Sequence, residues 1–340
     1  MRDIKNKLTS GKNTKNIKNR RGKSFGYQVL GFGAGGAGDS FICATGGTIT
    51  TSGDFKIHTF TGGGTFNVVS LATDTVNNVV SYLVVAGGGS GGSAGDSSGG
   101  GGGGGFRESK SAVDSYNASP ANATSGPTYN LPVSAQGYPI TIGAGGGPGI
   151  GAASVFSSIT SAGSGMGGPG PTTSAGVGQA GGSGGGGGSV TCNGSAGGAG
   201  NTPPVSPPQG SPGGAGRGNN DPLGGIRFGG GGGGAGSVGG NAGVNTQGCG
   251  GAGLSTNIAG PSLAFSGGAG AGEHANTSTC ATNFPNGSPC GTGGTGSNAS
   301  DSGARCGTAN RGGGGGGGSS AKPGIGYGGS GVVIVRYKIQ

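Results

Sequence analysis

The chain has 340 residues, of which 98 are glycine and none is tryptophan; 9% are charged, and the formal net charge is +9. Glycine buries almost no apolar area and loses more backbone entropy on ordering than other residues, so this composition excludes an ordinary side-chain core over most of the chain. Collagen is excluded as well, because the glycines are clustered without a Gly-X-Y period and only 17 residues are proline.

Residues 1–23 carry almost all of the net charge. They hold nine Lys or Arg side chains and one acid, a balance of +8, whereas the other 317 residues hold ten basic and nine acidic side chains. We interpret residues 1–23 as a flexible basic arm that attaches the protein to an acidic surface. The expected anchoring residues are Lys18, Arg20, Arg21 and Lys23. Residues 24–45, which mix aromatic and small side chains, are interpreted as a docking or lead-in segment.

Residues 46–87 have the pattern of a small β module. Three strands separated by glycine-containing turns at hairpin spacing are predicted at 47–52, 55–60 and 65–70. Residues 79–86 (VVSYLVVA) form a continuous β-branched run, typical of a strand buried on both faces, and residues 331–339 (GVVIVRYKI) are equally strand-like. We expect these last two strands to pair, so that the C-terminal strand closes the module around the region between them.

Residues 88–330 are interpreted as a bundle of polyproline-II helices inserted into this module. Unbroken glycine runs occur at 99–105, 184–188, 229–234 and 312–318. Polyproline-II helices have three residues per turn and no internal hydrogen bonds, so glycine helices can approach closely and satisfy one another's amides. A disordered linker is the alternative interpretation. Against it, apolar segments such as 153–160 and 254–265 recur between the runs, and a linker has no need of them.

The polar connections of this region are candidate binding loops, because binding residues concentrate on loops of a rigid scaffold. They are predicted at 109–132, 201–212, 273–289 and 294–311. Tyr116, Tyr129 and Phe284 are isolated aromatics in such loops, a mixture suited to contact with a glycan or a protein surface. The same composition also suits solvated connectors without a partner.

No catalytic, cofactor or metal site is predicted. The chain has only two histidines, His58 and His274, and ten acids, with no convergent constellation of the kind that acid–base or metal chemistry needs. His58 is interpreted as an ordinary strand residue. A loop disulfide between Cys280 and Cys290 and free cysteines are both open. A zinc site made by these two cysteines with His274 and Cys306 would lack a C-x-x-C pair, which argues against it.

Four segments carry a resemblance to a known family. They are 46–61 (GGTITTSGDFKIHTFT), 82–89 (YLVVAGGG), 307–311 (GTANR) and 328–337 (GGSGVVIVRY). In this order they resemble the glycine-rich domain family, which is common in phage and marine viral genomes, over roughly residues 45–340. Residues 25–37 also resemble lead-in segments of marine phage structural proteins. In style the chain is similar to the polyglycine-sandwich adhesins at the tips of T-even-type tail fibres.

The resemblance implies a non-enzymatic virion protein, most simply a component of a tail fibre or similar surface appendage, made in the host cytoplasm. Its expected partners are other virion proteins and a host-surface glycan or outer-membrane protein, with several copies or a homo-oligomer per particle. No apolar run has the length of a transmembrane helix and no secretory signal is visible, so we expect no membrane insertion. Alternatives are a capsid-decorating or head-fibre protein, a nucleic-acid-binding protein that acts through the basic arm, and an ice-binding protein.

Overall fold

The computed structural model describes residues 40–93, 97–170, 176–189, 194–218, 227–244, 246–272, 292–296, 306–319 and 324–340. The chain divides into two units, Met1–Ser40 and Phe41–Gln340. The expected arm and most of the lead-in segment fall in the first unit and outside the described residues. The fold below is that of the second unit.

The described residues are mostly strands and extended segments, with one 3-10 turn (η2, Thr75–Asn77), in agreement with the expected class of mostly irregular and β structure. One antiparallel sheet has the order β1-β4-β8-β9-β10, with β1 Cys43–Thr45, β4 Gly64–Ser70, β8 Gly137–Thr141, β9 Ser154–Phe156 and β10 Ile159–Ser161. The other has the order β2-β3-β13-β5-β6, with β2 Thr48–Ser52, β3 Phe55–Phe60, β13 Val332–Lys338, β5 Val79–Val85 and β6 Phe106–Ser109, and β7 (Leu131–Pro132) also pairs with β5. A separate hairpin consists of β11 (Leu254–Thr256) and β12 (Leu263–Phe265).

The two apolar strands that flank the glycine-rich region lie next to each other. β13 is hydrogen-bonded to β5 on one side, with Val332 opposite Val85 and Arg336 opposite Ser81, and to β3 on the other. All seven residues of β5 and the first six of β13 are buried. Their β-branched side chains suit a strand covered on both faces, and the same run would be insoluble at an exposed sheet edge.

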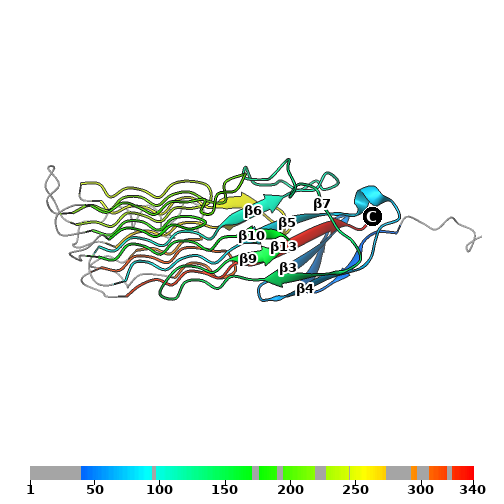
Figure 1. The fold of residues 1–340 in the computed structure, drawn as a ribbon, viewed down its shortest axis with the longest axis horizontal. Helices are drawn as coiled ribbons and strands as arrows, with labels where there is room; N and C mark the ends of the chain where they lie inside the picture. Colours follow the sequence, from blue (N-terminus) through cyan, green and yellow to red (C-terminus); the bar gives the residue numbers. More distant parts are fainter. Residues whose placement is uncertain are drawn as a thin grey trace, which may run out of the picture. The chain divides into compact units, whose positions relative to one another are not determined.

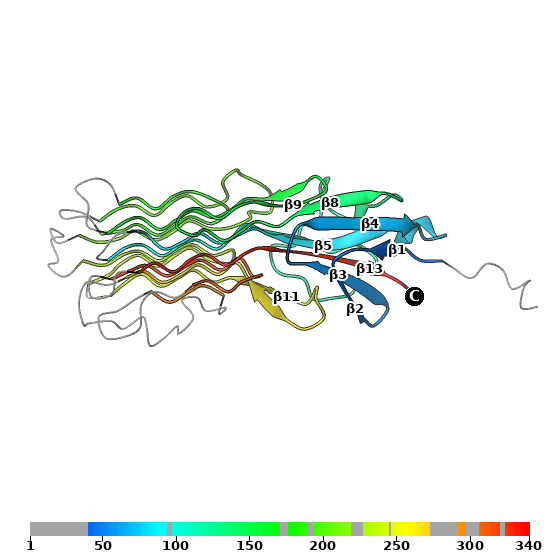
Figure 2. The same cartoon turned by 90° about the horizontal axis from the view of Figure 1, so that it is seen from below.

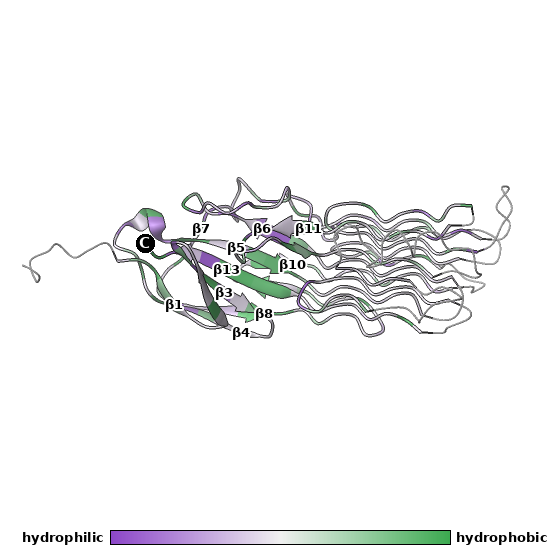
Figure 3. Cartoon of the chain, turned by 180° about the vertical axis from the view of Figure 1, so that it is seen from behind, coloured by the Kyte–Doolittle hydropathy of each residue, from purple (hydrophilic) through white to green (hydrophobic). Residues whose placement is uncertain are grey.

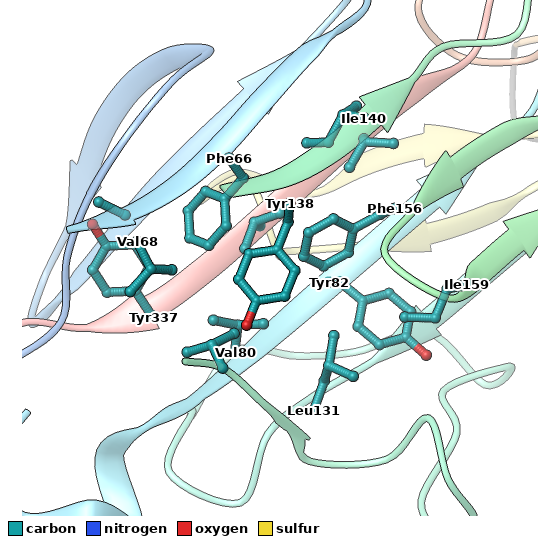
Figure 4. Close-up of a cluster of buried hydrophobic side chains, with 14 of the residues drawn as sticks. Phe66, Val68, Val80, Tyr82, Leu131, Tyr138, Ile140, Phe156, Ile159 and Tyr337 are labelled. Carbon is teal, nitrogen blue, oxygen red and sulfur yellow. The ribbon is translucent and has the colours of Figure 1, made fainter. Parts of the chain in front are cut away.

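Side chains alternate between the two faces of the second sheet and contribute to two hydrophobic cores, one on each face. Between the sheets lie aromatic residues from both, among them Phe66, Tyr82, Tyr138, Phe156 and Tyr337 (Figure 4). Their rings pack at centroid distances of 6.1–6.4 Å, several of them edge to face or tilted. On the other face, Leu83, Phe106 and Ile334 pack under the β11–β12 hairpin and the segment that contains Tyr116.

The glycine runs form a lattice of extended segments that lie side by side and lead away from the sheets (Figures 1 and 2). Apolar side chains concentrate in the sheets, whereas the lattice is nearly featureless in hydropathy (Figure 3). The N–H groups of 99–105 bond in rotation to three neighbours. Gly99, Gly102 and Gly105 donate to Gly168, Gly165 and Ala162; Gly100 and Gly103 to Gly230 and Gly233; Gly101 and Gly104 to Gly315 and Gly312. Backbone amides thus take the place of side chains as the interior of this region.

Close approach makes glycine a steric requirement in the lattice. A Cβ atom built on Gly231 would lie 1.9 Å from the carbonyl oxygen of Cys249, and one built on Gly314 would lie 2.1 Å from that of Gly101. Real Cβ atoms do not come this close to a backbone oxygen, so any side chain would separate two segments and break their hydrogen bonds.

The β module and the glycine-rich region are not consecutive blocks of sequence. Seven strands, β6 to β12, come from residues 88–330, and β1 comes from the segment 24–45. The glycine-rich chain therefore returns to the sheets repeatedly, where the apolar segments expected at 153–160 and 254–265 form β9–β10 and β11–β12. The expected boundaries at 45/46 and 87/88 are not boundaries in space, because strand pairing crosses both of them.

Candidate functional site

A buried ion pair ties the first polar connection to the last strand. The Nε atom of Arg336, in β13, lies 3.1 Å from both carboxylate oxygens of Asp114, and the two side chains are 6% and 0% exposed. Ser81, in β5, donates a second hydrogen bond to Asp114, and the Arg336 guanidinium stacks over the ring of Phe55 at 4.5 Å. The connection after β6 is thus held in one place by charge as well as by packing.

Glu108 fixes the same connection from β6. One carboxylate oxygen accepts the backbone N–H of Ser119 at 2.9 Å, and the other accepts the hydroxyl of Thr256 from β11. With 1% exposure, Glu108 is buried beneath the segment that it binds. Both acids hold backbone and side chains together, which is a structural use and not a catalytic constellation.

The structure describes two of the three aromatics proposed as receptor contacts, Tyr116 and Tyr129. Tyr116 is 6% exposed, in the core cluster that also holds Phe106 and Ile334, with the Arg336 guanidinium 5.5 Å from its ring. Burial is the main cause that raises the pKa of its hydroxyl. Its ring is therefore not available to a partner, a correction to the sequence interpretation: an isolated aromatic in a polar loop can also be the residue that anchors that loop. Tyr129 is half-buried.

The remaining predicted site residues are not described. Phe284 and the four basic residues Lys18, Arg20, Arg21 and Lys23 lie outside the described residues. So do His274, Cys280 and Cys290. Cys249 is disulfide-bonded, while Cys43 and Cys306 are free and exposed.

Exposed non-glycine side chains occur on the outer faces of the lattice. Val177, Val238 and Val244 are examples, with exposed fractions of 46%, 61% and 48%. Val238, Asn241 and Val244 are spaced by three residues, the same period as the hydrogen bonding inside, and all three are exposed. These three side chains carry no charge.

An open groove of about 560 Å³ lies where the lattice meets the sheets. Its apolar wall comes from Ile150, Ala152 and Ala153 on one side and from Pro203 and Val205 on the other. Arg107 of β6 supplies the single charge of the lining. Alternation in β6 buries Phe106 and Glu108 on one face and places Arg107 on the opposite one. Sequence alone does not indicate this groove, because its walls come from three distant parts of the chain.

Among the described residues no group of three or more His, Cys, Asp or Glu side chains could hold a metal ion. In the same part of the chain, no helix has the length and hydropathy that a membrane span requires. The one buried histidine described, His58, packs in β3 between Phe66 and Tyr337 at ring centroid distances of 5.1 and 5.6 Å.

Fold and composition together define a glycine-lattice protein, in which a β sandwich anchors stacked backbone segments. The family model described as "Glycine-rich domain" matches residues 61–338. The chain belongs to this glycine-rich domain family. No curated protein matches the sequence significantly.

Proposed function

We propose that this protein is a non-enzymatic structural component of a phage particle, most simply part of a tail fibre or similar appendage with a role in binding the host surface. The observation that carries the proposal is the hydrogen bonding of the glycine runs, each of which is tied in rotation to three neighbours. A backbone lattice of this kind is stiff and chemically bland, and suits an appendage whose specificity is supplied by its connections and outer faces. The resemblance of the framing segments to phage proteins supports the same assignment.

The glycine segments are, in this proposal, polyproline-II helices. Contacts to each neighbour recur at every third residue, which is the repeat of a helix with three residues per turn. At about 3.1 Å per residue, a seven-residue run would extend roughly 22 Å. The C-terminal strand then closes the module around this bundle.

The basic arm is the proposed attachment to other virion proteins, and the host contact falls to exposed surface. Tyr129 and Phe284 remain candidate contacts, whereas Tyr116 is excluded by its burial. The proposal places the protein in several copies or as a homo-oligomer on the particle, made in the host cytoplasm and without insertion into a membrane.

Mass spectrometry of purified particles, with immunogold labelling, tests this proposal. The expected result is the intact chain on the tail or its fibres, and labelling of the head would replace the appendage by a capsid-decorating role. Absence from the particle would refute a virion function altogether. Deletion of residues 1–23 should abolish incorporation while the body stays folded. Normal incorporation of that variant, with loss of salt-sensitive nucleic-acid binding, would instead assign the arm to nucleic acid.

A further inference from the structure

The groove at the junction of lattice and sheets is built in advance of any ligand. Its outer wall is the segment 201–209, which Asn201 and Gln209 hold in shape. The Asn201 side-chain oxygen accepts the backbone N–H groups of Val205 and Gln209 at 3.1 and 3.2 Å. Gln209 is 1% exposed, and its amide bridges the N–H of Ala162 and the carbonyl of Pro203, both at 2.8 Å. A wall fixed in this way loses little entropy when it binds.

Arg107 brings a positive charge into this groove that nothing in the described chain neutralises. Among the described residues its guanidinium makes one long hydrogen bond, 3.5 Å from Nη1 to the carbonyl oxygen of Thr160. No described carboxylate forms an ion pair with it; the buried acid Glu108 next to it in sequence is on the other face of β6 and already bonded to Ser119 and Thr256. A guanidinium has five donors, so most of them remain for a planar anion such as a carboxylate.

The rest of the groove defines what the anion is attached to. Ile150 is 61% exposed, and Ala152, Ala153 and Thr160 are exposed as well, so the groove is shallow and open to water. An acyl chain would stay wet in such a groove. A sugar ring suits it, since one face of the ring packs its C–H groups on aliphatic side chains while its hydroxyls stay solvated or meet Ser158 and Thr160.

We propose that this groove binds a carboxylated sugar residue of a cell-surface polysaccharide, with Arg107 paired to the carboxylate and Ile150, Ala153 and Val205 under the ring. The inference rests on the proposed host-binding function and names the chemical class of ligand for it. It also assigns the specific contact to the junction of the lattice and the sheets and not to the aromatic loops.

Calorimetric titration of the full chain tests the groove with matched probes. We would titrate trigalacturonate and its trimethyl ester, then sialyllactose and its methyl ester; in each pair only the first carries a carboxylate. We expect the carboxylated probe of each pair to bind at least about tenfold more tightly than its neutral counterpart. This ratio corresponds to the usual contribution of a charge-assisted hydrogen bond. Arg107→Gln should abolish this preference. Lys56→Gln, which removes a charge on β3 away from the groove, should leave it unchanged.

A second variant distinguishes a loss of ligand binding in the groove from a general loss of folding. Ala153→Phe fills the groove from an exposed position and leaves Arg107 in place. It should therefore weaken binding of both probes of a pair, and the midpoint of unfolding should not change. Binding that is equal for charged and neutral probes, equal in Arg107→Gln, or absent for all probes with a folded protein overturns the proposal. If the groove proposal fails but the protein is found on particles, the virion function is unaffected. If the protein is absent from particles, the virion function is refuted, and ligand binding by the groove is unaffected.

Discussion

The hydroxyl of Tyr337 lies 3.2 Å from the Nε2 atom of His58, so a side chain of the last strand meets one of the first hairpin across 279 residues of sequence. The other ring nitrogen, Nδ1, lies 2.7 Å from the carbonyl oxygen of Gly46. A carbonyl oxygen can only accept, so Nδ1 carries a proton. Burial lowers the pKa of His58, so at neutral pH Nε2 is unprotonated and accepts from the tyrosine hydroxyl. The imidazole is thus neutral, fully buried and bonded at both ends.

Tyr337→Phe should destabilise the protein by about 1–3 kcal/mol, because it leaves the buried Nε2 of His58 without a donor. The loss would be measured as a lower midpoint of chemical unfolding with an unchanged slope. Tyr327→Phe, at a residue that is 51% exposed, is the matched control and should have little effect. Equal stability of the two variants would show that the His58–Tyr337 bond contributes nothing.

Stability should fall as the pH drops below about 6.5. Burial is the main cause that lowers the pKa of His58 below the ordinary histidine value of 6.5, so the unfolded chain takes up the proton before the folded one does. The unfolded state then binds more protons between the folded pKa and 6.5, and the free energy of unfolding declines through that window as pH falls. Above it the contribution is fully present. His58→Gln should show a smaller decline between pH 6.5 and 5, measured by denaturant unfolding at each pH, and an identical pH profile would contradict this.

Gly101→Ala should destabilise the lattice by several kcal/mol, in the range of severe overpacking. An added Cβ would lie 2.2 Å from the carbonyl oxygen of Gly89 and 2.6 Å from that of Ser90. Gly147→Ala is the matched control, because its Cβ would meet only the Tyr327 side chain, at 3.9 Å. Thermal unfolding and amide hydrogen exchange across 99–105 would measure the difference. If both variants behave alike, the close packing of the glycine segments is refuted.

Asp114→Asn should cost about 3–5 kcal/mol, because it leaves the Arg336 guanidinium buried without its counter-charge. Limited proteolysis should also become faster in the segment after β6, which this pair holds against β13. The exposed Asp54, whose side chain accepts a hydrogen bond from the Gln340 amide, provides Asp54→Asn as a control with a small effect. A stable, protease-resistant Asp114→Asn protein would show that packing of Tyr116 and Phe55 alone positions this segment.

The strands were predictable, and the arrangement of the sheets was not. Val79–Val85 and Val332–Lys338 are recognisable as strands because β-branched and other apolar side chains dominate both, with Ser81 the one polar interruption of the first and Arg336 that of the second. In contrast, β9–β10 and β11–β12 are three-residue strands embedded in glycine-rich sequence. Such short strands are stable only through the pairs they make, so local pattern carries little information about them.

Tyr116 and Arg107 show the same limit for the candidate site. Nothing in the residues around Tyr116 distinguishes a loop aromatic that faces water from one that plugs a core, because the difference lies in Phe55 and Arg336, which are distant in sequence. Arg107 follows a glycine run in a short charged segment with Glu108 and Lys110, and nothing in that segment marks it as a groove residue. Only folding brings the segments 150–163 and 203–209 against it.

The sequence by itself determined that the backbone must be the packing material over residues 88–330, since glycine leaves no side chains to bury and its amides still require partners. It also determined which segments have enough apolar side chains to form the two sheets and the core between them. The tertiary structure alone decided which amide meets which carbonyl. Every glycine run presents the same surface to its neighbours, so the order of segments in the lattice depends on the strands that join these segments to the sheets and on contacts such as that of Gln209 with Ala162.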